Sequence, residues 1–458
     1  MSVSSLPFLH GALAAVLPKL AAWRRDFHAH PEAGWTEFRT AALIIRRLRE
    51  LGYAIRMGEA ACASDRRMGV PSSAVLAAAR ERALEHGADA ELVAGMGDGY
   101  TGFWADLDCG PGPVTAFRFD MDCNEVAECA EESHRPVREG FASRWPGLMH
   151  ACGHDGHAAV GLGLAEVLVS IRRHLRGRIR LIFQPAEEGA RGALPMSEAG
   201  AVDGVDVLFG FHIGFKAEGP GSLICGTQGF LATTKRDVLF SGVPAHAGAA
   251  PEEGKDALLA ACSAVVNLHA ISRNGKGGTR IAVGRLEGGE ARNVIPASAR
   301  LFMETRGETT ELDAYMTAES ERILRASADL WGCACEWRTV GNSAGGGSSP
   351  ELARLIATVA EAMGGWKTVI PMSGFGATED FACLMSRVQA SGGLASYLQV
   401  GTDRAAGHHS DRFDFDETCL GRALELLARL AVRMAGGGQE DTETETESDM
   451  EFLDEVVR

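Results

Sequence analysis

The chain has 458 residues, of which 46% are hydrophobic and 23% charged, an ordinary globular balance with room for two domains. The formal net charge is −16 and no Lys- or Arg-rich run occurs, so we expect no nucleic-acid partner. No apolar run reaches the roughly 18 residues of a membrane span, so we expect no membrane insertion. The 11 cysteines follow no disulfide spacing, which favours a reducing, cytoplasmic location.

The first half of the chain alternates predicted helices and strands. The segment from Leu6 to Trp23 is apolar but interrupted by Pro18 and Lys19, which predicts an amphipathic helix and not a signal peptide. Buried strands followed directly by polar side chains are typical of open α/β sheets, whose sites lie beyond the carboxyl ends of the strands. The next predicted elements are a helix over residues 22–51, a strand over 114–119 followed by Asp120 and Asp122, a helix over 156–175, and strands over 178–183 and 205–211.

Beyond about residue 230 the segments follow a β-α-β-β-α-β order, which matches the ferredoxin-like pattern. We therefore expect an inserted lid domain over residues 230–344, within a metal-binding catalytic domain made of residues 1–229 and 345–436. Residues 341–349 have linker composition, and the acidic tail 437–458 has the composition of a disordered segment. The lid elements are a strand over 233–242, a helix over 253–271, strands over 280–286 and 298–306, a helix over 311–330, and a strand over 334–340.

Residues 149–157 are the most informative stretch, because Cys152, His154 and His157 fall within six residues. Thiolate and imidazole suit Zn²⁺, and a site that adds carboxylates also takes Mn²⁺. Cys152 and His154 come just before a predicted helix, where backbone N–H groups and the helix dipole favour a thiolate. An isolated cysteine is usually an inert buried thiol, but the flanking histidines favour a metal site here.

Carboxylates and further imidazoles follow other predicted strands. Glu187 and Glu188 come directly after a buried strand and a proline, where a site is favoured over a solvated turn. His212 ends the next apolar strand; alone it would be interpreted as a core histidine, and His409 alone as a loop histidine. Together these residues supply metal ligands and one spare carboxylate, which is what a hydrolytic metal centre needs.

The motifs resemble those of the aminoacylase/carboxypeptidase-type dinuclear metallopeptidases, in the amidohydrolase branch that includes hippurate and auxin-conjugate hydrolases. The resemblance covers about residues 8–435. It implies an α/β fold with an open mixed sheet flanked by helices, of the metal-dependent exopeptidase type, and an inserted α+β ferredoxin-like lid. The segments that carry it are residues 24–32, 117–122, 149–157, 184–189, 245–248 and 409–410.

The resemblance also implies roles for individual residues. It implies two divalent metal ions per site, with Mn²⁺ favoured and Zn²⁺ compatible, and Glu187 as the general base. His246, Asn293 and Arg306 would meet the substrate's oxyanion and carboxylate, with His246 reaching across a dimer. The metal ligands that it implies are Cys152, His154, Glu188, His212 and His409.

A long segment, residues 56–100, narrows the resemblance to the p-aminobenzoyl-glutamate hydrolases, as do residues 133–136, 140–143 and 406–409. This implies cleavage of a folate catabolite, p-aminobenzoyl-glutamate, to p-aminobenzoate and glutamate. It also implies either a homodimer or a heterodimer with a homologous B-type chain. Two alternatives stay open: a hydrolase of another N-acyl amino acid, of the hippurate or auxin-conjugate type, and a non-catalytic subunit that binds metal.

Overall fold

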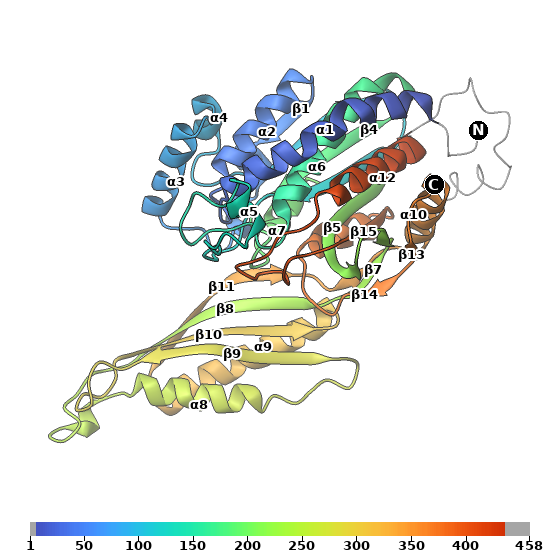
Figure 1. The fold of residues 1–458 in the computed structure, drawn as a ribbon. Helices are drawn as coiled ribbons and strands as arrows, with labels where there is room; N and C mark the ends of the chain where they lie inside the picture. Colours follow the sequence, from blue (N-terminus) through green and yellow to red (C-terminus); the bar gives the residue numbers. More distant parts are fainter. Residues whose placement is uncertain (1–5, 436–458) are drawn as a thin grey trace.

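The computed structural model describes residues 6–435. Its largest sheet has eight strands, in the order β1-β2-β4-β3-β5-β15-β6-β13 (Figure 1). The four middle strands, β4, β3, β5 and β15, run parallel to one another, so their carboxyl ends meet at one edge of the sheet. The strands are β1 (Ala54–Met57), β2 (Phe103–Asp108), β3 (Val114–Asp120), β4 (Arg178–Gln184), β5 (Val207–Glu218), β6 (Ser222–Ile224), β13 (Thr368–Ile370) and β15 (Leu394–Thr402).

Helices cover both faces of this sheet. Along β3, Phe117 and Phe119 pack into the core on one face, whereas Ala116 packs into the core on the other. Burial on both faces explains why the parallel strands are almost continuously apolar. One face carries α1 (Pro7–Ala29), α2 (Phe38–Glu50), α6 (His154–Ser170), α10 (Pro350–Met363) and α12 (Thr418–Ala435), and the other carries α7 (Ala193–Glu198) and α11 (Phe381–Ala390).

A second, four-stranded antiparallel sheet has the order β11-β8-β10-β9. Two helices pack on one of its faces around a separate apolar core, and its other face is open. In Figure 1, α8 lies on the side of this sheet that faces away from the eight-stranded sheet. The predicted β-α-β-β-α-β order is confirmed, with β8 (Ala232–Ser241), α8 (Ala257–His269), β9 (Thr279–Gly288), β10 (Ser298–Gly307), α9 (Thr310–Leu330) and β11 (Ala334–Ser343).

The remaining elements are short. A third sheet has the order β12-β7-β14 and lies next to the root of the lid. None of the helices within residues 6–435 is both long and apolar enough to cross a lipid bilayer. The elements are α3 (Ser73–Glu85), α4 (Ala90–Gly95), α5 (Arg135–Arg138), β7 (Thr227–Phe230), β12 (Gly346–Gly347), β14 (Ser373–Gly374) and four 3₁₀ turns, Gly58–Ala61, Ser64–Arg66, Arg172–His174 and Pro251–Glu253.

Two predictions about the chain path are wrong. The single helix predicted over residues 22–51 is two helices, because α1 ends at Ala29 and α2 begins at Phe38. Pro31 explains the break, since it lacks an N–H and disfavours helical geometry at the residue before it. Residues 341–349 are not a free linker: β11 runs to Ser343, and the buried Ser348 hydroxyl accepts hydrogen bonds from two backbone N–H groups. The acidic tail 437–458 lies outside the described residues.

Candidate metal and proton-transfer site

The predicted ligands gather at the carboxyl edge of the parallel strands. Residues that follow β3 and β4, a residue within β5, and the loop after β15 meet the start of α6 at this edge. The turn before α6 depends on Gly153, whose φ of 91° is one that a side chain rarely permits. This turn places Cys152 and His154 next to the strand ends, as the motif spacing had indicated.

His212 and His154 each direct one ring nitrogen into the cluster. The Nδ1 of His212 donates to the carbonyl oxygen of Ile213 at 2.8 Å, and its Nε2 faces the Sγ of Cys152 at 3.4 Å. The Nδ1 of His154 donates to the carbonyl oxygen of Asp122 at 2.9 Å. The Nε2 of His154 is buried and has no hydrogen-bond partner among residues 6–435. A backbone carbonyl that holds one ring nitrogen and frees the other is the usual support for a histidine metal ligand.

Glu188 and His409 meet on another side of Cys152. The Nε2 of His409 lies 3.3 Å from the Oε1 of Glu188. One ligand atom from each of Cys152, Glu188 and His409 lies within 4.8 Å of the others. Burial acts to raise the pKa of Glu188, but the interactions with His409 and His154 prevail and lower it to about 2. Glu188 is therefore an anionic carboxylate throughout the physiological range of pH.

The donor set fits divalent cations. Cys152 belongs to two groups of candidate ligands, one with His212 and one with Glu188 and His409. Burial, together with the negative charge of Glu188, raises the pKa of the Cys152 thiol well above its ordinary value. The expected preference for a thiolate at the helix start is therefore overridden, and the thiolate requires a cation beside it. A buried His154 Nε2 without a hydrogen bond is consistent with the same interpretation.

His408 also lies near the thiol of Cys152, so proximity alone does not distinguish it from His409. Both of its ring nitrogens are engaged. Nδ1 accepts a hydrogen bond from Arg404 at 2.8 Å, and Nε2 donates to the carbonyl oxygen of Ile213 at 3.2 Å. Burial and the charge of Arg404 lower the pKa of His408 to about 4. His409 is the better candidate ligand, because its Nε2 is directed at a carboxylate within the cluster.

Glu187 is the spare carboxylate of the cluster. Its carboxylate forms a group with His154 and Glu188, and a second group with Glu379 and Asp380. Burial raises the pKa of Glu187 well above its ordinary value, and the negative charges of Glu379, Glu188 and Asp380 raise it further. A carboxyl group with a raised pKa can accept and return a proton near neutral pH.

Arg118 supports the cluster from within the sheet. Its guanidinium is fully buried and donates to Gln184 at 2.8 Å, to Asp120 at 2.5 Å and to Glu379 at 2.9 Å. The hydroxyl of Tyr397 donates to the second oxygen of Glu379 at 2.6 Å. One cation therefore balances carboxylates that would otherwise lie unpaired beneath the site.

Asp120 and His157 extend this support to the strand that carries His212. The Nδ1 of His157 donates to Asp120 at 2.5 Å, and its Nε2 accepts the backbone N–H of Ile213 at 3.0 Å. Sequence reasoning did not assign these supporting roles, nor those of Glu379 and Asp380. The adjacent carboxylates at 379–380, just before a helix, were the only available signal.

The base loop, residues 185–192, carries Glu187 and Glu188 in a strained conformation. Ala186 and Ala190 have φ values of 50° and 62°, and His409 across the cluster has a φ of 65°. Such conformations are costly outside glycine and persist where surrounding contacts fix them. Three buried carboxylates supply those contacts: Glu37 accepts from Ala186 N at 2.8 Å, Asp122 from Glu188 N at 2.9 Å, and Asp380 from Gly192 N at 3.1 Å and Ala193 N at 2.9 Å.

Two residues predicted to meet the substrate lie away from the cluster of their own chain. His246 and Asn293 are exposed and adjacent, since the backbone N–H of Ala247 donates to the carbonyl of Asn293 at 3.0 Å. They flank the end of β10 that begins at Ser298, whereas Arg306 lies near its other end, at the root of the lid. At about 3.3 Å per residue, those ends are on the order of 25 Å apart.

Arg306 is paired within the lid. Its Nε donates to Oε1 of Glu304 at 2.8 Å and its Nη2 to Oε2 at 3.2 Å. The fork that was expected to hold a substrate carboxylate is therefore occupied by a carboxylate of the chain itself.

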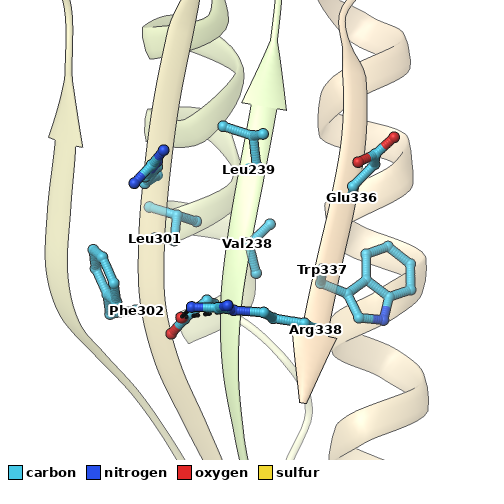
Figure 2. A pocket seen from close by; sticks show the side chains of 9 residues that line it. Val238, Leu239, Leu301, Phe302, Glu336, Trp337 and Arg338 are labelled. Carbon is cyan, nitrogen blue, oxygen red and sulfur yellow. Dashed lines mark hydrogen bonds and ion pairs between the residues drawn. The ribbon is translucent and has the colours of Figure 1, made fainter. Parts of the chain in front are cut away.

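The open face of the lid sheet also carries a hollow of about 400 Å³, lined in part by Leu239, Phe302, Trp337 and Arg338 (Figure 2). It lies along the middle of β8, β10 and β11, not at the strand ends where the candidate ligands gather. Arg338 is paired with Asp237 at 2.8 Å. The hollow brings no candidate ligand or base into contact with the cluster, so we assign no chemistry to it.

Two curated relatives are similar over nearly their whole length. The chain is 46% identical to the A subunit of p-aminobenzoyl-glutamate hydrolase from Escherichia coli (strain K12), over 91% of this chain and 96% of the relative. It is 44% identical to indole-3-acetyl-aspartic acid hydrolase of Enterobacter agglomerans, over 93% and 98%.

Solved structures agree with these similarities. An aminobenzoyl-glutamate utilization protein from Klebsiella pneumoniae matches with a TM-score of 0.79 at 39% identity, covering 93% of this chain and 98% of that one. The Bacillus subtilis YXEP protein, described as a dinuclear metal binding peptidase from the M20 family, matches with a TM-score of 0.61 at 25% identity, covering 92% and 98%. The family model for "Peptidase family M20/M25/M40" matches residues 116–433, and the chain belongs to that family.

Proposed function

We propose that this chain is a metal-dependent amidohydrolase that cleaves p-aminobenzoyl-glutamate to p-aminobenzoate and glutamate. The observation that carries the proposal is a buried carboxyl of raised pKa, Glu187, which lies among residues with the donor chemistry of a metal centre. The similarity to a p-aminobenzoyl-glutamate hydrolase supports this choice of substrate. An intact base among intact candidate ligands also weighs against a purely non-catalytic role.

The proposed metal ligands are Cys152, His154, Glu188, His212 and His409. When bound there, a pair of divalent ions supplies a water of lowered pKa and polarises the amide carbonyl. We favour Mn²⁺ by resemblance, and the thiolate and imidazole donors are also compatible with Zn²⁺. Metal analysis of the purified chain by plasma mass spectrometry, with activity restored to the stripped protein by each ion in turn, would decide between the two ions.

In the proposed reaction, Glu187 takes a proton from the attacking water as the new C–O bond forms. It then gives that proton to the amide nitrogen as the C–N bond breaks, so that the amine leaves in a neutral form. The water oxygen ends in the new carboxylate, and the released amino acid retains the nitrogen. The neighbouring charges of Glu379 and Asp380 favour the protonated form of Glu187, which suits the second transfer.

His246 is proposed to act on the site of a neighbouring chain. Its Nδ1 accepts the backbone N–H groups of Gly248 and Ala249, each at 3.1 Å. The ring proton is therefore on Nε2, and His246 can donate to an oxyanion. Because the lid holds His246 far from its own cluster, we propose an active homodimer, or a heterodimer with a homologous B-type chain. The heterodimer is supported by the name of the Escherichia coli relative, which describes one of two kinds of chain. Asn293, adjacent to His246, would contribute to the same neighbouring site.

We also propose that residues 230–344 move as a lid relative to residues 1–229 and 345–436. A reducing cytoplasm is the proposed location, since all 11 cysteines are free.

A second substrate is supported by a specific observation, the 44% identity to an indole-3-acetyl-aspartic acid hydrolase. The test is steady-state kinetics of the metal-loaded chain on p-aminobenzoyl-glutamate, indole-3-acetyl-aspartate and hippurate, with and without a co-purified B-type partner. We expect the highest kcat/KM on p-aminobenzoyl-glutamate. A higher kcat/KM on indole-3-acetyl-aspartate would select the auxin-conjugate alternative, and no hydrolysis of any of the three would reject the proposal.

A further inference from the structure

Lys235 on β8 is a cation without a carboxylate partner at the rim of the candidate site. No hydrogen bond or ion pair of its ammonium group occurs among the described residues, and the side chain is half-buried. A half-buried ammonium group costs free energy unless an anion or water compensates it. Lys235 therefore requires explanation more than a fully exposed lysine would.

The strand register places an acidic side chain next to Lys235, yet the two do not pair. Glu304 on β10 lies directly opposite Lys235 in the antiparallel ladder. Both carboxylate oxygens of Glu304 turn instead to Arg306, at 2.8 and 3.2 Å. This fork-to-fork pair uses the carboxylate fully and leaves the ammonium group of Lys235 available.

The other neighbour of Lys235 in the sheet connects it to the base loop. Gly341 on β11 pairs with Lys235, at a point where the register shifts. A Cβ at Gly341 would collide with the carbonyl oxygen of Gly189 and would lie 3.2 Å from the Cδ of Lys235. The lysine stem, the bare glycine and the base loop therefore meet at one place. The backbone N–H of Asn342 donates to the carbonyl of Ala190 at 2.8 Å, which holds this junction together.

Lys235 also lies within electrostatic reach of the cluster. The hydrogen bond with Glu188 raises the pKa of His409, and the positive charge of Lys235 opposes that rise. Lys235 is on the open face of the lid sheet, since Val238 and Phe240 of the same strand pack under the helices on the other face. The ammonium group is thus near a candidate metal ligand, on the face that the lid helices leave uncovered.

Arg191 is the other cation at this rim, and its donors are occupied. Its Nε donates to the carbonyl of Glu188 at 3.0 Å and its Nη1 to the carbonyl of Gly69 at 3.1 Å. Arg191 therefore holds the base loop against the segment before α3, and it is a weaker candidate for an anion site than Lys235.

We propose that Lys235 binds the side-chain carboxylate of the amino acid released by cleavage, and so selects N-acyl aspartates and glutamates over N-acyl neutral amino acids. This inference rests on the proposed amidohydrolase function. It agrees with the names of both curated relatives, one an aspartic acid conjugate hydrolase and the other a glutamate conjugate hydrolase. A local cation would also offset the repulsion between a dianionic substrate and a chain of net charge −16.

The test compares two nearly isosteric substrates, p-aminobenzoyl-glutamate and p-aminobenzoyl-glutamine. K235M removes the charge and keeps the apolar stem over Gly341, K235R restores a cation, and K255M is a matched control at an exposed lysine elsewhere on the lid. We expect K235M to lose about 10- to 100-fold in kcat/KM on the glutamate substrate, mostly through KM, and less than about threefold on the glutamine substrate. K235R should recover most of the loss, and K255M should match the unsubstituted chain on both substrates. Equal losses on the two substrates, or no loss on either, would overturn the inference.

Calorimetric binding to the inactive E187Q chain separates this inference from the proposed function. We expect the affinity of the E187Q chain for p-aminobenzoyl-glutamate to fall about 10- to 100-fold when K235M is added, and its affinity for p-aminobenzoyl-glutamine to stay the same. If the unsubstituted chain binds with this discrimination but hydrolyses neither compound, the proposed reaction fails and the role of Lys235 stands. If the E187Q chain binds the glutamate compound no better than the glutamine compound, the inference fails whatever the turnover.

Discussion

The backbone N–H of Asn342 donates to the carbonyl oxygen of Ala190 at 2.8 Å, so the last residues of a lid strand are bonded to the loop that carries Glu187. The Asn342 side chain donates in turn to the carbonyl of Thr233 and to the hydroxyl of Thr234, each at 3.1 Å. The root of the lid and the base loop therefore form one hydrogen-bonded unit. Any movement of the lid has to pivot beyond this point or break these bonds.

Replacing Glu187 by Gln should abolish most turnover while leaving metal content and fold unchanged. The substitution removes only the group that transfers the proton, and general-base effects are typically about 10²- to 10⁴-fold. The measurements are kcat, metal content and the circular dichroism spectrum. A variant that retains more than about a tenth of kcat would exclude Glu187 as the general base.

Replacing Cys152 by Ser should sharply lower bound metal after dialysis. A hydroxyl does not ionise near neutral pH, whereas a thiol beside a cation can. C262S is the matched control, because Cys262 is exposed on α8 of the lid. Elemental analysis should show a loss in C152S alone. Unchanged metal content in C152S would mean that Cys152 is not a ligand.

Mixing two inactive variants should restore activity if sites are shared between chains. H246A and E187Q are each expected to be nearly inactive. Under conditions of subunit exchange, a mixed dimer contains one site with both residues intact, so up to about half of the sites in mixed dimers should recover. Activity is followed against the mixing ratio. If mixing restores nothing, His246 acts within its own chain; if H246A alone is fully active, His246 has no role in the reaction.

Replacing Arg118 by Met should destabilise the fold by about 3–5 kcal/mol, because it leaves buried carboxylates without their cation. Urea unfolding measures the change. R285M is the control, since Arg285 pairs with Glu287 at the exposed surface of the lid, and such a pair contributes about 1 kcal/mol or less. Similar losses in the two variants would mean that the buried network contributes little to stability.

Stability should fall at alkaline pH because of Glu37. Burial, and then the charge of Asp122, raise the pKa of Glu37 to about 8. A carboxyl whose pKa is raised on folding stabilises the fold fully below its unfolded pKa of about 4.5, and that contribution is lost as pH rises through about 8. E37Q keeps the acceptor for Ala186 and cannot ionise, so its melting temperature should vary less between pH 5 and 9. Parallel melting curves for E37Q and the unsubstituted chain would contradict this assignment.

Local patterns in the sequence predicted much of the fold and of the candidate cluster. β3 and β4 are apolar runs that end in polar side chains, and Cys152 and Glu188 lie next to motifs that resemble a known family. The order of the lid elements followed in the same way from alternating periodicities. The break at Pro31 was available locally but was outweighed by helical spacing on both sides of it.

The supporting residues could not be predicted, because their roles depend on partners distant in sequence. Arg118 is separated from Glu379 by 261 residues, and nothing near either residue indicates the other. The availability of Lys235 depends on Glu304 turning to Arg306, a choice between two cations that only packing decides. The glycine-rich segment after β11 has the composition of a linker, but its backbone is bonded to β7 and β15.

The Arg118 network has a consequence for synthesis on the ribosome. Asp120 and Gln184, two of its partners, emerge early, but Glu379 and Asp380 follow only after the whole lid has been made. An N-terminal fragment that closed its sheet early would bury a guanidinium group with part of its counter-charge missing. His409 emerges later still, so the first 230 residues alone also lack one candidate metal ligand. The chain therefore has a physical reason to leave its large sheet open until translation is nearly complete, which protects it from capturing metal in an incomplete site.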